Sequence, residues 1–241
     1  MSAESANALG GRNYPCRPVK QESESLRLTL LGVGAMNSPR YAPAGLFVEQ
    51  ARSRVIIDGG PGSITAGRIT AWLVTDERSE LRREIRKLAQ AKGLEPEVAA
   101  FRSDVLIVEP RAVIHTSHPT FGYLIRFRGT KIVWAPEFLV FPSWAKGADL
   151  MFAEAAGWKR PILFRGRVGG HACVEQVARD APKYKVKRLV FAHIGRPTIK
   201  AMDAGERSMF GDFGAEGDVY SLRDQSNFVR RTSSKHRDRS P

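Results

Sequence analysis

The sequence predicts one α/β domain, a sandwich of two mixed sheets with helices on the outside. Short apolar strands alternate with amphipathic helices, hairpin signals are mixed among them, and several strands end on a carboxylate or a histidine. The chain has 241 residues and no linker-like stretch divides it. Such a length suits one large domain with a proper core.

We expect the folded domain to span residues 26–222. Residues 1–25 carry Ser, Glu, Gly and Asn without periodicity, which predicts a flexible leader. Residues 223–241 are rich in arginine and lysine, which predicts a basic, disordered tail.

Residues 26–62 are the stretch around which the predicted domain is organised. Three short apolar runs, residues 28–31, 46–48 and 55–57, predict strands, and the last of them ends on Asp58 and a Gly-Gly-Pro-Gly turn. A carboxylate at the end of a strand, beside glycines, lies at a sheet edge where backbone can approach a ligand closely.

A fourth strand at residues 71–74 precedes a charged amphipathic helix. Thr75 or Asp76 is the expected N-cap, and Gly93 is expected to close the helix. The apolar residues of this helix recur at three- and four-residue spacing: Leu81, Ile85, Leu88 and Ala89.

The second half of the chain repeats the alternation of strands and helices. Arg128-Gly129 lies between alternating apolar runs and predicts a hairpin. A buried strand at 150–153 ends at Glu154, Gly169-Gly170 leads into His171 and a helix, and a strand at 188–192 ends on His193. The other expected strands are residues 105–108, 112–114, 122–126 and 131–134.

The charge is strongly basic, with 38 Lys plus Arg against 25 Asp plus Glu and a net charge of +13. Such an excess attracts polyanions, so a nucleic acid or a phosphorylated partner is one interpretation. The other is that the basic tail accounts for part of the excess without any such partner. No apolar run approaches the roughly 20 residues of a membrane span, and the first residues lack a signal-peptide core. We therefore expect a cytoplasmic protein without a membrane partner.

Four of the five histidines stand at strand ends or turns: His115, His118, His171 and His193. Asp58, Glu137 and Glu154 stand at similar places. Imidazoles and carboxylates that converge from several strand ends are what a zinc or manganese site needs. Any one such histidine is more often an ordinary hydrogen-bonded residue, so only their joint placement favours a metal.

Five segments in order resemble the motifs of metallo-β-lactamase-fold hydrolases, in particular the ribonuclease Z and phosphodiesterase branch. The segments are IDGGPG with Asp58, HPTFGY with His118, WAPE with Glu137, GGHA with His171 and LVFAH with His193. The resemblance implies the sandwich fold and metal binding by His118, Glu137 and His193. It also implies a catalytic role for His171 on the leaving group, and an orienting role for Asp58.

One motif of that family is missing. Members have T-H-x-H-x-D-H after the fourth strand, where this chain has TDERSEL at residues 75–81. Asp76 and Arg78 take the places of the first two histidines, Glu80 that of the aspartate and Leu81 that of the last histidine. A guanidinium stays charged and cannot ligate a metal.

Three outcomes therefore stay open. One ion, zinc or manganese, binds through His118, Glu137 and His193 with Asp76 or Glu80; or Arg78 holds a phosphate in place of a metal; or residues 76–81 are only the first turn of a helix and the site is vestigial. The resemblance and the charge favour a divergent metal-dependent hydrolase of phosphodiester bonds, acting on a small anionic substrate. The alternative is a non-catalytic protein that binds a nucleotide or nucleic acid. The oligomeric state is left open, a homodimer included.

Overall fold

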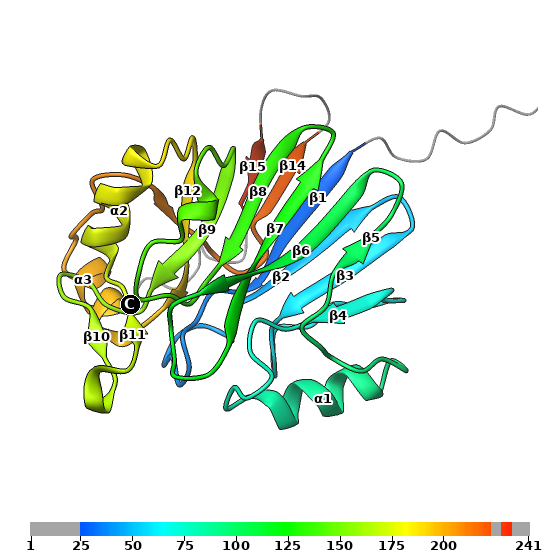
Figure 1. The fold of residues 1–241 in the computed structure, drawn as a ribbon, viewed down its shortest axis with the longest axis horizontal. Helices are drawn as coiled ribbons and strands as arrows, with labels where there is room; N and C mark the ends of the chain where they lie inside the picture. The colour runs from blue at the N-terminus through cyan, green and yellow to red at the C-terminus, as the bar shows by residue number, and fades with distance from the viewer. Residues whose placement is uncertain (1–24, 223–227, 233–241) are drawn as a thin grey trace, which may run out of the picture.

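The computed structural model describes residues 25–222 and 228–232 as a sandwich of two mixed β-sheets (Figure 1). The first sheet has the strand order β15-β14-β1-β2-β3-β4 and the second the order β13-β12-β9-β8-β7-β6-β5. The predicted fold class is confirmed.

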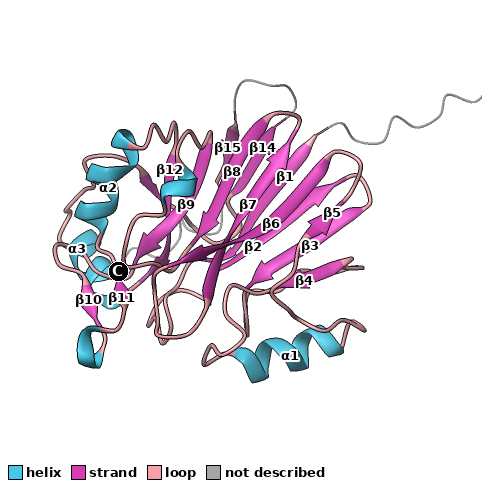
Figure 2. Cartoon of the chain, in the orientation of Figure 1, coloured by secondary structure: helices cyan, strands magenta, loops and turns pink. Residues whose placement is uncertain are grey.

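Figure 2 shows how strands dominate the chain. The strands of the first sheet are β1 (Leu26–Gly32), β2 (Gly45–Gln50), β3 (Ser53–Asp58), β4 (Ala71–Leu73), β14 (Val219–Leu222) and β15 (Val229–Arg231). Those of the second are β5 (Phe101–Arg102), β6 (Leu106–Val113), β7 (Thr120–Phe127), β8 (Thr130–Ala135), β9 (Leu150–Ala155), β12 (Leu189–Ile194) and β13 (Asp212–Phe213). A small hairpin pairs β10 (Ile162–Leu163) with β11 (Gly170–His171).

The core lies between the two sheets, and period-two alternation creates it. Leu26, Leu28 and Leu30 are fully buried while the residues between them are not, because successive side chains of a strand point to opposite faces. Strands β9 and β12 are buried at every position, as expected for strands covered on both faces.

Three helices complete the domain: α1 (Arg82–Gln90), α2 (Val174–Lys183) and α3 (Arg196–Asp203). Helix α2 packs on β9 and β12. Helix α1 lies beside β4 in Figure 1, and its Ile85 and Ala89 join a separate apolar cluster with Trp72 of that strand. In the described ranges no helix is long and apolar enough to span a membrane.

The structure corrects the predicted ends of three elements. Helix α1 begins at Arg82 rather than at the predicted cap. The two strands expected at 105–108 and 112–114 form one strand, β6, through Pro110. Since β5 pairs only with Ile107 and Val108, Pro110 lies on an open edge where no backbone N–H is needed. His171 lies in β11, three residues before helix α2, and does not open that helix.

The predicted disordered tail is wrong for residues 229–231, which pair with β14 as β15. Arg230 explains this strand, because its guanidinium donates to the buried carboxylate of Asp218 at 2.7 Å and to the carbonyl of Phe213 at 3.0 Å. The predicted leader, up to residue 24, and residues 223–227 and 233–241 lie outside the described residues.

Candidate metal centre

The predicted site residues come from strand ends and loops that meet at one edge of the sandwich. Glu137 follows β8, Glu154 lies near the end of β9, and His193 lies near the end of β12. These three strands are parallel neighbours in the second sheet, so their carboxyl ends lie together, where α/β proteins bind ligands. A cavity of about 470 Å³ opens there.

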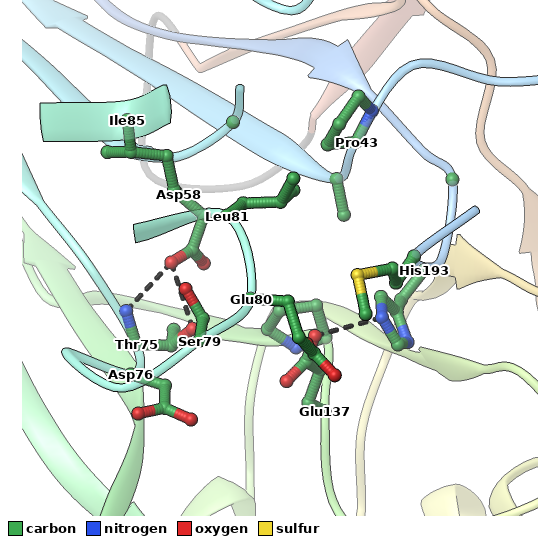
Figure 3. Close-up of a pocket in the computed structure, with 15 residues that line it drawn as sticks. Pro43, Asp58, Thr75, Asp76, Ser79, Glu80, Leu81, Ile85, Glu137 and His193 are labelled. Carbon is green, nitrogen blue, oxygen red and sulfur yellow. Dashed lines mark hydrogen bonds and ion pairs between the residues drawn. The ribbon is translucent and has the colours of Figure 1, made fainter. Parts of the chain in front are cut away.

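Glu137 lies between two imidazoles in this cavity. Its Oε1 is 2.9 Å from His193 Nε2 and its Oε2 is 3.1 Å from His115 Nε2. Burial alone would raise the pKa of Glu137, but His193 and His115 hold it well below its usual value. Figure 3 shows the contact with His193.

The Nδ1 of each of these two rings also forms a hydrogen bond. His115 Nδ1 donates to the carbonyl of Gly170 at 2.9 Å, and His193 Nδ1 donates to Glu154 Oε1 at 3.0 Å. With Nδ1 carrying the proton, the neutral form of each ring presents the lone pair of Nε2 to the cavity.

Glu154 is fully buried and accepts four hydrogen bonds. Its Oε1 accepts from Ala156 N at 2.9 Å and from His193, and its Oε2 accepts from Phe138 N at 3.2 Å and from His171 Nδ1 at 2.8 Å. Burial opposes its ionisation, yet His171 and His193 lower the pKa of Glu154 to about 2. Glu154, His171 and His193 place one donor atom each within 4.8 Å of one another, but a cation on Glu154 would have to displace these bonds. Glu154 therefore orients the two rings.

His118 lies on another wall of the same cavity. Its Nε2 is 2.9 Å from Asp76 Oδ2 and 3.1 Å from Oδ1. The structure thus pairs His118 with Asp76, and it places His115, absent from the predicted ligand set, on Glu137.

Residues 76–81 form a loop, not the first turn of a helix. The carboxylate of Asp76 accepts from the backbone N–H of Arg78 at 2.7 Å and contacts His118, so it is not available to cap α1. The loop brings Arg78 and Glu80 to the wall of the cavity.

Asp58 connects the two sheets beside the cavity. Its Oδ1 accepts from the backbone N–H of Thr75 at 2.7 Å and from its hydroxyl at 2.9 Å, and its Oδ2 accepts from Trp134 Nε1 of the opposite sheet at 2.7 Å. Burial raises the pKa of Asp58 to about 6. A smaller cavity of about 60 Å³ lies between Asp58, Glu80, Glu137 and His193 (Figure 3).

The nitrogen and oxygen donors of His115, Glu137 and His193 are of the types that a first-row divalent ion takes. Donors that share one such ion lie about 3 to 3.5 Å apart, because each lies about 2 Å from it. Glu137 is near this separation from each ring, through a different oxygen for each. Burial lowers the pKa of His193, but Glu137 and Glu154 raise it to about 10, which favours a proton on Nε2, facing Glu137. A bound cation can take the place of that proton. A ring nitrogen fixed by a carbonyl or carboxylate is the usual support of a metal-binding histidine.

Sequence reasoning placed His115 and Glu154 among the candidate strand-end residues but gave neither a role in the site. Nothing in the loop between β6 and β7 tells which of its two histidines faces Glu137. Glu154 did carry a signal: a carboxylate within the otherwise apolar strand LMFAEA is buried and needs several partners.

No family model matches the sequence, and no curated protein sequence matches it. Solved structures do match. YhfI from Bacillus subtilis, described as a metallo-β-lactamase fold protein, is 11% identical with a TM-score of 0.63, covering 82% of this chain and 99% of that chain. A diphosphatase from the PhnP family is 18% identical with a TM-score of 0.60, covering 82% and 97%. Zn²⁺-bound PqqB from Methylobacterium extorquens is 12% identical with a TM-score of 0.62, covering 80% and 99%. The chain has the metallo-β-lactamase fold.

Proposed function

We propose that the protein is a metal-dependent hydrolase with a single-ion site, acting on a phosphodiester or a related anionic substrate. The observation that carries the proposal is the position of Glu137 between His115 Nε2 and His193 Nε2. The Nδ1 atoms of the two rings donate hydrogen bonds to a backbone carbonyl and to the carboxylate of Glu154. The similar folds of a Zn²⁺-bound protein and a diphosphatase support it.

His115, Glu137 and His193 would hold the ion, and their nitrogen and oxygen donors suit zinc or manganese. When bound, such an ion supplies a hydroxide at neutral pH by lowering the pKa of water and stabilises charge on a phosphoryl oxygen. Asp76 and His118, hydrogen-bonded to each other in the lining of the same cavity, would orient the attacking water by accepting a hydrogen bond from it.

His171 is the proposed general acid. His171 Nδ1 donates a hydrogen bond to Glu154 at 2.8 Å. This bond fixes the ring and leaves Nε2 as the nitrogen that can gain or lose a proton. The ring lines the cavity, so a protonated Nε2 can give its proton to a leaving oxygen.

Arg78 and Arg196 supply positive charge at the same cavity. Both line it, and in the described part of the chain neither forms an ion pair with a carboxylate. A guanidinium without a carboxylate partner can bind a phosphate through two parallel hydrogen bonds. These two side chains are the proposed contacts for the anionic group.

Metal content tests the site. Protein purified without chelator should carry about one zinc or manganese ion per chain, the number that one set of three protein ligands holds. His115→Ala and His193→Ala should remove the ion, whereas His236→Ala, which deletes a histidine outside the described residues, should retain it. His118→Ala decides between the two histidines of the loop: retention of the ion supports His115 as the ligand. A protein free of metal in every preparation would overturn the proposal.

A second candidate function rests on Arg78. If this guanidinium holds a phosphate without any metal, the protein binds a nucleotide or nucleic acid in the cavity and catalyses nothing. Binding of AMP to chelator-treated protein, measured by calorimetry, addresses this function. Binding that disappears in Arg78→Ala, in a protein that never takes up a metal, would favour it over the hydrolase.

A further inference from the structure

The outer face of strands β5 to β8 carries a row of basic side chains. Arg102 pairs with Ile107, Ile107 with Arg126, and Arg126 with Lys131, so these four residues form one line across four strands. Residues paired in this way lie on the same face of a sheet. The next line, Val108, Ile125 and Ile132, is fully buried in the core between the sheets. The basic row must therefore face outward.

Two further charged residues of β6 share this face, since they lie two and four positions beyond Ile107. Glu109 forms ion pairs with Arg102 and, at 3.0 Å, with Arg111. The single carboxylate of Glu109 thus contacts two guanidinium groups but balances the charge of only one of them. The four strands contain four basic residues, Arg102, Arg111, Arg126 and Lys131, against this single acidic residue.

The basic row is accessible and its cations are close enough to repel one another, whereas Leu124 and Val133, which share this face beside Glu109, are buried. The side chains of Arg102 and Arg111 are 60% and 44% exposed, and Arg126 is exposed as well. Partial burial and then the charges of Arg126 and Arg111 lower the pKa of Lys131. Helix α2 covers the other half of this sheet, at β9 and β12 (Figure 1).

Other acidic groups do not cancel this excess. Asp149 accepts the backbone N–H of Lys131 at 2.8 Å, and it also forms an ion pair with Lys187 at 2.7 Å. Asp104 lies at the edge, in the loop before β6. The edges of the face also carry two basic residues, so the count of edge charges is balanced. They are Arg128 in the β7–β8 turn and Lys146, whose carbonyl accepts a hydrogen bond from Lys131 Nζ.

We infer that this outer face of β5 to β8 binds the sugar-phosphate backbone of a nucleic acid. Adjacent strands lie about 4.8 Å apart, so the row spaces its cations at one or two strand widths, and the separation of successive phosphates along a nucleic-acid chain lies between these two spacings. The planar guanidinium group of arginine can donate two parallel hydrogen bonds to the oxygens of one phosphate. The row itself has no aromatic side chain for base stacking, and the indole of Trp144, farther along this face beside Gly122, donates to the carbonyl of Ala112. The binding would therefore rest on the phosphates and be independent of sequence.

The proposed face is separate from the metal centre. Arg126 lies near the end of β7, whereas Thr120, at its start, follows the loop of His115 and His118. Six residues of extended strand span about 20 Å. The proposed binding on this face therefore does not depend on the hydrolase proposal. His193→Ala should leave RNA binding on this face unchanged.

The test is the salt dependence of binding to a fluorescent random-sequence RNA, measured by anisotropy on the full chain. The charge-deletion variant is Arg102→Ala, Arg126→Ala and Lys131→Ala combined. The matched control is Arg82→Ala, Arg83→Ala and Lys87→Ala on helix α1, where all three side chains are exposed and the same charge is removed. Thermal melts establish that both variants are folded.

Each phosphate contact adds about 0.7 to 0.9 to the slope of log K against log salt. The charge-deletion variant should therefore lose about two slope units and bind at least 10-fold more weakly at low salt, while the control stays near wild type. Equal losses in both variants, or a wild-type slope near zero, would overturn the inference. So would binding to phosphatidylserine vesicles that depends on these three residues while RNA binding does not.

Discussion

Replacing Glu154 by glutamine is the sharpest test of how the histidines of the candidate metal centre are held. The substitution keeps the shape of the side chain but puts an NH₂ group where one carboxylate oxygen now accepts two hydrogen bonds. Either Ala156 N and His193, or Phe138 N and His171, would then face a donor. At about 1.5 kcal/mol for each bond to a charged group, the loss is about 3 kcal/mol of unfolding free energy.

The pKa of Glu154 gives a second estimate of the same quantity. The folded-state pKa of about 2 lies roughly 2.3 units below the unfolded value, and this corresponds to about 3 kcal/mol. Because the folded pKa is depressed, this stabilisation is fully present above about pH 4.3 and is lost as pH falls towards 2. The difference in stability between wild type and Glu154→Gln should therefore be level between about pH 4.3 and 6.5 and shrink below pH 4. It should also shrink as pH rises above about 6.5, because Glu154 helps to raise the pKa of His193.

Urea unfolding of chelator-treated protein at several pH values measures this difference. Metal affinity, measured by competition with a chromophoric chelator, should fall about 10- to 100-fold, as expected when the support of a metal-binding histidine is removed. Asp180→Asn is the control, because that carboxylate forms only a surface ion pair with Lys183, worth less than about 1 kcal/mol. An unchanged unfolding midpoint in Glu154→Gln, with the ion retained, would refute the orienting role.

Three further predictions concern the surroundings of the site. Gly169→Ala should lose the metal although it replaces no ligand, because its Cβ would lie 2.0 Å from the carbonyl oxygen of His115 and displace that residue. Gly93→Ala, with no atom within 4 Å, should retain the metal. Metal analysis of both variants decides, and equal metal content would contradict the prediction. Trp134→Phe leaves one oxygen of Asp58 without its donor and should cost about 1 to 3 kcal/mol in urea unfolding, so an unchanged midpoint would argue against this bond. In metal-free protein the pKa of Asp58 is raised to about 6, so the folded state binds more protons than the unfolded state between about pH 4 and 6. The unfolding free energy of wild type, relative to that of Asp58→Asn, should therefore fall by about 3 kcal/mol as pH rises through this window and stay level above it. A difference that stays level across the window would be inconsistent with that pKa.

The fold could be predicted because period-two burial and strand-ending glycines are local properties of the sequence. The strand that ends before Glu137, the strand that contains His193 and the hairpin at Arg128-Gly129 all form as predicted. The order of the strands in each sheet is not local, and only the motif resemblance indicated it.

The details of the site depend on contacts that no local pattern contains. His115 is chosen over His118 by a hydrogen bond to Gly170, 55 residues later in the chain. The loop at residues 76–81 resembles a helix start because acidic residues favour one, but Asp76 is bound to His118 across the cavity instead.

His193 stands in a left-handed backbone conformation, with φ of 66°, at an irregularity in the pairing of β12 with β9. A residue with a Cβ is strained there, at a cost of about 1 kcal/mol or more, and glycine would relax the chain. Glycine would, however, leave the buried carboxylates of Glu137 and Glu154 without the ring that they now bind, and that loss exceeds the strain. The contacts of the imidazole therefore hold this residue in a backbone conformation that it does not prefer.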